Sequence, residues 1–73
     1  MSSCKDVELI TNYGTYIPQC KADGTYNEKQ CHASIGYCWC VDSISGVEIQ
    51  GTRKGPGQGD VICSTSIILL FFI

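Results

Sequence analysis

The feature that most constrains the fold is the tripeptide Cys38-Trp39-Cys40, which holds two of the six cysteines and the single tryptophan. Alternate side chains of an extended strand point to opposite faces, so both sulfurs would share one face and the indole would take the other. Two cysteines placed in this way cannot bridge each other without strain, so each needs a partner elsewhere. We therefore predict one strand crosslinked to two distant segments, with a core built outward from Trp39.

The chain is short for the number of cysteines that it carries, with six in 73 residues. A domain of this size buries little apolar surface and usually depends on crosslinks. An even number of cysteines in so short a chain indicates disulfides and an oxidising compartment. The sequence by itself leaves open which cysteines pair.

Zinc binding is the alternative use for these cysteines. Cys31-His32 and the nearby Cys-x-Cys supply suitable ligand types, but the sequence lacks the Cys-x2-Cys pairs typical of structural zinc. A Cys31/His32 nucleophile pair is disfavoured, because every cysteine has a potential disulfide partner and adjacent side chains need not face each other. The sequence shows no general-base constellation. We expect no metal, no cofactor and no enzymatic activity.

The charge distribution argues against a nucleic-acid partner. The formal net charge is −2, and the five basic residues are scattered, with only Arg53 and Lys54 adjacent. A nucleic-acid-binding protein would carry a basic stripe or patch. We therefore expect no nucleic-acid partner.

The two ends of the chain give conflicting signals about its location. No apolar stretch precedes Cys4, so no signal peptide is visible in this chain. Residues 67–73 are apolar and uncharged but too short to span a bilayer. We interpret residues 64–73 as an apolar tail: a truncated membrane segment, the stub of an anchor signal, a read-through end, or chain folded onto the domain. Membrane contact is expected only if the tail is a truncated anchor.

The first segment of the chain has the pattern of a short helix. Ser3 can cap it, and Asp6 lies three residues later, as in a capping box. Gly14 suits its end. The apolar face of this helix would consist of Cys4, Val7 and Ile10. A turn at residues 21–24 is then expected, with Gly24 free to adopt a positive φ.

The second half of the chain has the pattern of a small antiparallel sheet. We predict a strand from Tyr37 to about Ser43, a hairpin turn at Ser45-Gly46 and a returning strand at 47–49. Residues 51–60 hold four glycines and Pro56, so they form a loop with its tip at 54–57. The predicted fold class is a small disulfide-rich α+β domain at residues 1–63. It has one short N-terminal helix, a small antiparallel sheet, long loops and three disulfides.

An ordered set of short motifs across residues 4–63 resembles the thyroglobulin type-1 family. The matching pieces are Tyr16-Ile17-Pro18-Gln19-Cys20, Gly24-x-Tyr26, Gln30-Cys31, Gly36-Tyr37-Cys38-Trp39-Cys40-Val41-Asp42, Gly46-x-Glu48-x-x-Gly51-Thr52-Arg53 and Cys63. A lone Cys-Trp-Cys would be weak evidence, but the ordered set with all six cysteines is specific. The resemblance implies the sequential disulfides Cys4–Cys20, Cys31–Cys38 and Cys40–Cys63.

The resemblance also implies a function, because some members of the family, the thyropins, inhibit papain-like cysteine proteases. They present three loops as a wedge to the active-site cleft, without covalent chemistry. Carried over by position, the contact residues are Asn12, Tyr13, Gly14, Thr15 and Tyr16 in the first loop, Ala33, Ser34, Ile35 and Gly36 in the second, and Arg53, Lys54, Gly55, Pro56 and Gly57 in the third. The Cys4–Cys20 segment is shorter than in those inhibitors, and the stretch from Arg53 to Cys63 is longer.

The leading hypothesis is therefore a secreted or endolysosomal inhibitor of papain-like proteases of the cathepsin L type. The alternative is a non-inhibitory binding or structural module from a larger matrix, membrane or growth-factor-binding protein, and a third option is inhibition of aspartic proteases. At the residue level we expect Ile35 to be exposed as an apolar anchor. Tyr16 and Tyr26 are expected to cover the core, while Arg53 is either a partner contact or a solvated charge. His32 borders the second loop as a surface side chain; at the contact it would make inhibition depend on pH.

Overall fold

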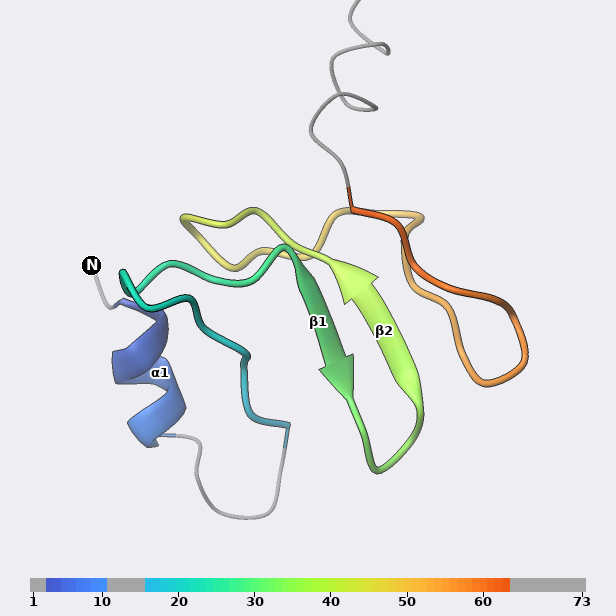
Figure 1. Cartoon of the computed structure of the whole chain (residues 1–73), viewed down its shortest axis with the longest axis horizontal. Coiled ribbons are helices and arrows are strands. Elements are labelled where there is room, and N and C mark those ends of the chain that lie inside the picture. Colours follow the sequence, from blue (N-terminus) through green and yellow to red (C-terminus); the bar gives the residue numbers. More distant parts are fainter. Residues whose placement is uncertain (1–2, 11–15, 64–73) are drawn as a thin grey trace, which may run out of the picture.

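A computed structural model describes residues 3–10 and 16–63 of the chain. It contains one helix, α1 (Cys4–Ile10), and two strands, β1 (Lys29–His32) and β2 (Tyr37–Cys40), which form a two-stranded antiparallel sheet (Figure 1). Long loops and three disulfides complete the described part of the chain. The predicted fold class, a small disulfide-rich α+β domain, is confirmed. Among the described residues, no helix is long and apolar enough to cross a membrane.

Helix α1 begins with the capping box that the sequence predicts. The Ser3 backbone N–H donates to Asp6 Oδ2 at 3.2 Å, and the Asp6 N–H donates to Ser3 Oγ at 3.3 Å. Cys4 is fully buried, whereas Ile10 is exposed. The buried part of the predicted apolar face is therefore limited to the first part of the helix. The expected end at Gly14 lies outside the described residues. A 2.8 Å hydrogen bond from the Cys4 N–H to the Gly24 carbonyl fixes the start of α1 to the turn at 21–24.

The sheet register explains how Cys38 and Cys40 reach different partners. Cys31 lies directly opposite Cys38, and Gln30 lies opposite Trp39. The alternation of side chains therefore places the sulfurs on one face of the sheet and the indole on the other, as predicted. Lys54 adds a single bridge to the outer edge of β2, with hydrogen bonds of 2.9 and 3.0 Å between its backbone and that of Cys38.

The predicted hairpin after β2 is only partly correct. A turn at residues 43–45 reverses the chain, and Gly46 has φ 78° where the ring of Tyr26 packs against it. However, β2 ends at Cys40, and the returning strand is reduced to one bridge between Val41 and Glu48. The reason is that the outer edge of β2 is shared between segments: the Cys40 N–H donates to Thr52 Oγ1 at 2.9 Å and Cys38 pairs with Lys54, so residues 47–49 keep only the bridge at Val41.

The core is small and surrounds the tryptophan, as the sequence predicts. Its buried cluster consists of Cys4, Tyr26, Trp39 and Val41, with Tyr16 and Cys20 packed against it. The disulfides are Cys4–Cys20, Cys31–Cys38 and Cys40–Cys63, with Cα–Cα distances of 5.7, 4.1 and 5.6 Å. This is the pairing that the family resemblance implies. The crosslinks thus join α1 to the segment at Cys20, β1 to β2, and β2 to the segment at Cys63.

Candidate functional site

The second loop, residues 33–36, forms the exposed turn between β1 and β2 (Figure 1). The N–H groups of Ile35 and Gly36 both donate to the His32 carbonyl, at 3.2 and 3.0 Å. Gly36 has φ 71°, a conformation that a residue with a Cβ rarely adopts. The side chain of Ile35 is 50% exposed at the tip of this turn, as expected. The loop therefore presents one apolar side chain on a closely bonded turn.

The third loop contains a turn at the predicted tip. The Gln58 N–H donates to the Gly55 carbonyl at 3.2 Å, and the Gly55 N–H donates to Gln58 Oε1 at 2.5 Å. Pro56 and Gly57 between them are exposed. Behind the turn, Asp60 accepts from Lys29 Nζ at 2.6 Å, and this bond holds the pKa of its carboxyl below the usual range. The third loop is thus held by hydrogen bonds within its own turn, and the chain that follows it is held to β1.

The second and third loops pack against each other. A Cβ added to Gly36 would lie 2.8 Å from Pro56 Cγ, so the Pro56 ring sits directly over this glycine. A Cβ added to Gly55 would lie 2.7 Å from Tyr37 Cζ, so Gly55 is buried beneath the ring of Tyr37. The chain therefore brings residues 33–36 and 54–57 into one continuous surface.

Arg53 is engaged within the domain. Its Nε and Nη2 donate to the two oxygens of the Glu48 carboxylate at 3.1 and 2.6 Å, and its guanidinium carbon lies 4.1 Å from the ring centre of Trp39. The bond from Arg53 lowers the pKa of the Glu48 carboxyl and raises that of the guanidinium. The sequence left open a partner contact or a solvated charge, but the structure shows an intramolecular clamp at the start of the third loop.

Tyr16 is the described residue of the first loop; Asn12, Tyr13, Gly14 and Thr15 lie outside the described residues. Its half-buried ring is centred 5.1 Å from Trp39 and 5.7 Å from His32. Burial raises the pKa of the Tyr16 phenol to about 12. Beside it lies a shallow groove of about 310 Å³. The lining residues are Tyr16, Ile17, Gln19, Cys31, His32, Ala33 and Ser34.

Two glutamines, to which the sequence analysis gave no role beyond the family motif, join the first loop to the sheet. Gln30 is only 1% exposed, and its amide oxygen accepts from the Gln19 N–H at 2.7 Å and the Tyr16 hydroxyl at 2.5 Å. Its amide nitrogen donates to the carbonyls of Gln19 and Asn27 at 2.8 and 2.7 Å. In return, the Gln19 amide bonds the N–H and carbonyl of Cys31 at 2.7 and 3.1 Å. The signal in the sequence was that each glutamine directly precedes a cysteine.

Residues 3–63 match the family model of the thyroglobulin type-1 repeat. The chain belongs to the thyroglobulin type-1 family. It is 50% identical over 52 residues to nidogen-1 from Homo sapiens, covering 71% of this chain and 4% of that protein. It is 46% identical over 56 residues to equistatin from Actinia equina, covering 73% and 24%. It is 50% identical over 50 residues to testican-1 from Mus musculus, covering 68% and 10%. The chain therefore spans less than a quarter of the length of each of these relatives.

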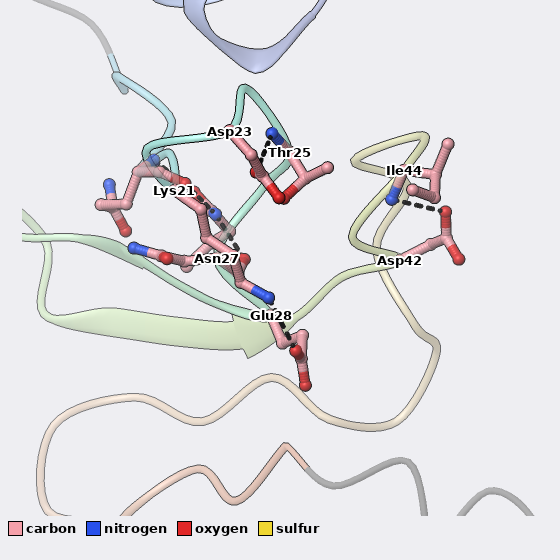
Figure 2. Close-up of polar contacts among 9 residues, drawn as sticks. Lys21, Asp23, Thr25, Asn27, Glu28, Asp42 and Ile44 are labelled. Carbon is pink, nitrogen blue, oxygen red and sulfur yellow. Dashed lines mark hydrogen bonds and ion pairs between the residues drawn. The ribbon is translucent and has the colours of Figure 1, made fainter.

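Away from the second loop, this thyroglobulin type-1 domain has two carboxylates that accept hydrogen bonds within their own turns (Figure 2). Asp23 accepts from the N–H and hydroxyl of Thr25 at 2.9 and 2.6 Å, and these bonds lower its pKa. Asp42 accepts from the N–H groups of Ser45 and Ile44 at 2.7 and 3.1 Å, which lowers its pKa as well. These turns lie away from the tip of the second loop (Figure 1). The joined second and third loops are therefore our candidate functional site.

Proposed function

We propose that this thyroglobulin type-1 domain inhibits papain-like cysteine proteases of the cathepsin L type by inserting its loops into the active-site cleft without covalent chemistry. The observation that carries this proposal is the packing of Pro56 on Gly36, which joins the second and third loops into one edge. Ile35 projects from that edge as an apolar anchor of the kind that dominates protein interfaces. The similarity to equistatin, a thyropin, supports the same function.

A rigid edge allows such short loops to bind a cleft tightly. The Cys31–Cys38 disulfide closes the second loop, and the Arg53–Glu48 ion pair holds the start of the third. Loops that are already ordered lose little conformational entropy on binding, so a modest contact area suffices for affinity. A rigid loop across the cleft also blocks substrate without offering an aligned peptide bond to the enzyme's thiolate.

The proposed contact surface comprises three groups of residues. The second loop contributes 33–36, and the third contributes the exposed Pro56 and Gly57. The first loop, 12–16, completes the wedge, with Tyr16 set at the groove beside Ser34. Lys54, Gly55 and Arg53 belong to the third loop, but their described contacts are internal, so we assign them to holding its shape.

A second function has its own support. Nidogen-1 and testican-1 match this chain at 50% identity, and the matched region is 4% and 10% of their lengths. On this view the domain is a non-inhibitory binding module of a larger protein. Both functions place it in an oxidising compartment, because all six cysteines are paired. We propose that this compartment is extracellular, with the endolysosome as the second candidate.

Titration of the oxidised full chain against papain-like and aspartic proteases tests the proposal. We expect inhibition of cathepsin L-type enzymes, and Ile35→Asp should raise the inhibition constant about 10-fold or more. The matched control is Ile44→Asp, because Ile44 is also exposed (65%) but lies in the turn at residues 43–45. Equal effects of the two substitutions would contradict the assigned surface. Absence of inhibition by micromolar protein with native disulfides would favour the module.

A further inference from the structure

The three disulfides differ in how well the protein covers them. Cys4 is 0% exposed and Cys40 is 3% exposed, so each of their two disulfides has one buried cysteine. Cys31 and Cys38 are both only half-buried, and neither belongs to the buried cluster around Trp39. An external thiolate therefore has its easiest approach to the Cys31–Cys38 bond.

The Cys31–Cys38 bond also closes the shortest loop, and the backbone around it is held independently. Its sequence separation is 7, against 16 and 23 for the other two. Cys38 exchanges two backbone hydrogen bonds with Lys54, and the Gln19 side chain bonds the N–H and carbonyl of Cys31. These bonds keep both strands in place when the sulfurs separate. What the crosslink adds is the closure of residues 33–36.

We propose that Cys31–Cys38 is a redox switch, which a dithiol reductant opens while the other two disulfides persist and the domain stays folded. A thiolate of the reductant attacks the Cys31 sulfur, forms a mixed disulfide and releases the Cys38 thiolate, which takes a proton. The second thiol of the reductant, as its thiolate, then attacks the reductant sulfur that is bonded to Cys31 in the mixed disulfide. This step releases the Cys31 thiolate, which is also protonated. Two electrons and two protons pass to the protein, and the reductant leaves as a disulfide.

The consequence of opening is a looser second loop. Without the crosslink, the turn at 33–36 is held by its hydrogen bonds to the His32 carbonyl and by the contact between Gly36 and Pro56. A loop with more conformations loses more entropy when it binds. Where the domain acts as the proposed inhibitor, and the switch rests on that function, reduction lowers its affinity for the protease. The selectivity of reduction itself does not depend on that function.

Timed reduction with dithiothreitol, followed by alkylation and mass mapping of the full chain, tests the selectivity. We expect Cys31 and Cys38 to be alkylated about 10-fold faster than the other four cysteines, with the far-ultraviolet circular dichroism and Trp39 fluorescence of the native protein retained. Earlier opening of either other disulfide, or loss of all three together with unfolding, would overturn the switch. This readout is decisive even if the oxidised protein inhibits no protease.

The effect on function is measured separately with the double variant Cys31→Ala/Cys38→Ala. We expect it to keep the native circular dichroism and to have an inhibition constant at least about 10-fold above that of the oxidised protein. The partly reduced wild type, alkylated at the same two cysteines, should show the same rise in the inhibition constant. This control separates the opening of the disulfide from any effect of the alanine substitutions. An unchanged inhibition constant in both proteins would show that opening the Cys31–Cys38 bond does not affect inhibition.

Discussion

The buried side-chain amide of Gln30 holds the segment at 16–19 to the sheet. Its hydrogen bonds take the place of those that a neighbouring strand would make. All four of its bonding positions are used, by Tyr16, Gln19 twice and Asn27. A buried polar group is stabilising only when its partners are present. The geometry therefore makes Gln30 a central residue of the fold, although its type is usually found at the surface.

Replacement of Gln30 by Ala tests this role. The substitution leaves the Gln19 N–H, the Tyr16 hydroxyl and the Asn27 carbonyl without their partner, so we expect the free energy of unfolding to fall by about 3 kcal/mol. Chemical denaturation of the oxidised protein measures it. Gln50→Ala is the control, because Gln50 is exposed and should change stability by less than about 0.5 kcal/mol. Similar values for the two variants would show that the network contributes little.

Single residues also show which contacts could be predicted from the sequence. Trp39 was placed correctly in the core and Ile35 correctly at an exposed tip, because each follows from side-chain size and neighbouring residues. Arg53 could not be resolved, since its partners Glu48 and Trp39 come together only after the chain has turned twice. Gln30 was missed for a similar reason: its bonds reach 3 to 14 positions along the chain.

At the level of elements, the sequence correctly predicted features set by neighbouring residues. It did not predict a strand edge that pairs with more than one segment. The capping box of α1 depends on residues three positions apart, and it forms as predicted. The strand that contains Trp39 was predicted to reach Ser43 but ends at Cys40, because its outer edge is shared with Thr52 and Lys54 as well as with residues 47–49. The family resemblance implied that the second and third loops lie together in one wedge, but the particular contact between them was not predicted. It joins Gly36 to Pro56, and nothing in either segment by itself indicates the other.

Gly36→Ala tests whether this loop contact matters. Ala at φ 71° is strained by about 1–2 kcal/mol, and its Cβ would also press on Pro56. Gly51→Ala is the matched control, because Gly51 has φ 82° with nothing within 4 Å of an added Cβ. We expect both variants to lose stability, but only Gly36→Ala to displace the third loop and weaken protease inhibition. Equal losses in stability and inhibition would mean that the two loops act independently.

On the scale of the whole molecule, crosslinks replace much of the hydrophobic core. The buried hydrophobic residues of the described chain are Cys4, Tyr26, Trp39, Cys40, Val41 and Val61, and two of these are disulfide cysteines. This balance follows from length and cysteine content, and the sequence therefore predicted it correctly. The pairing itself came from the family resemblance, because cysteine count by itself does not select one set of partners.

Removal of each disulfide in turn should rank the crosslinks by loop length and burial. Chain entropy gives about 2.4 kcal/mol for the separation of 7, about 3.1 for 16 and about 3.4 for 23. Removing a pair that includes buried Cys4 or Cys40 also leaves a cavity, which adds to the loss. A domain this small has only about 3–5 kcal/mol from a core of its own. We therefore expect Cys4→Ala/Cys20→Ala and Cys40→Ala/Cys63→Ala to be largely unfolded at 37 °C, while Cys31→Ala/Cys38→Ala stays folded. Thermal denaturation followed by circular dichroism measures the order, and a Cys31→Ala/Cys38→Ala variant less stable than the other two would contradict it.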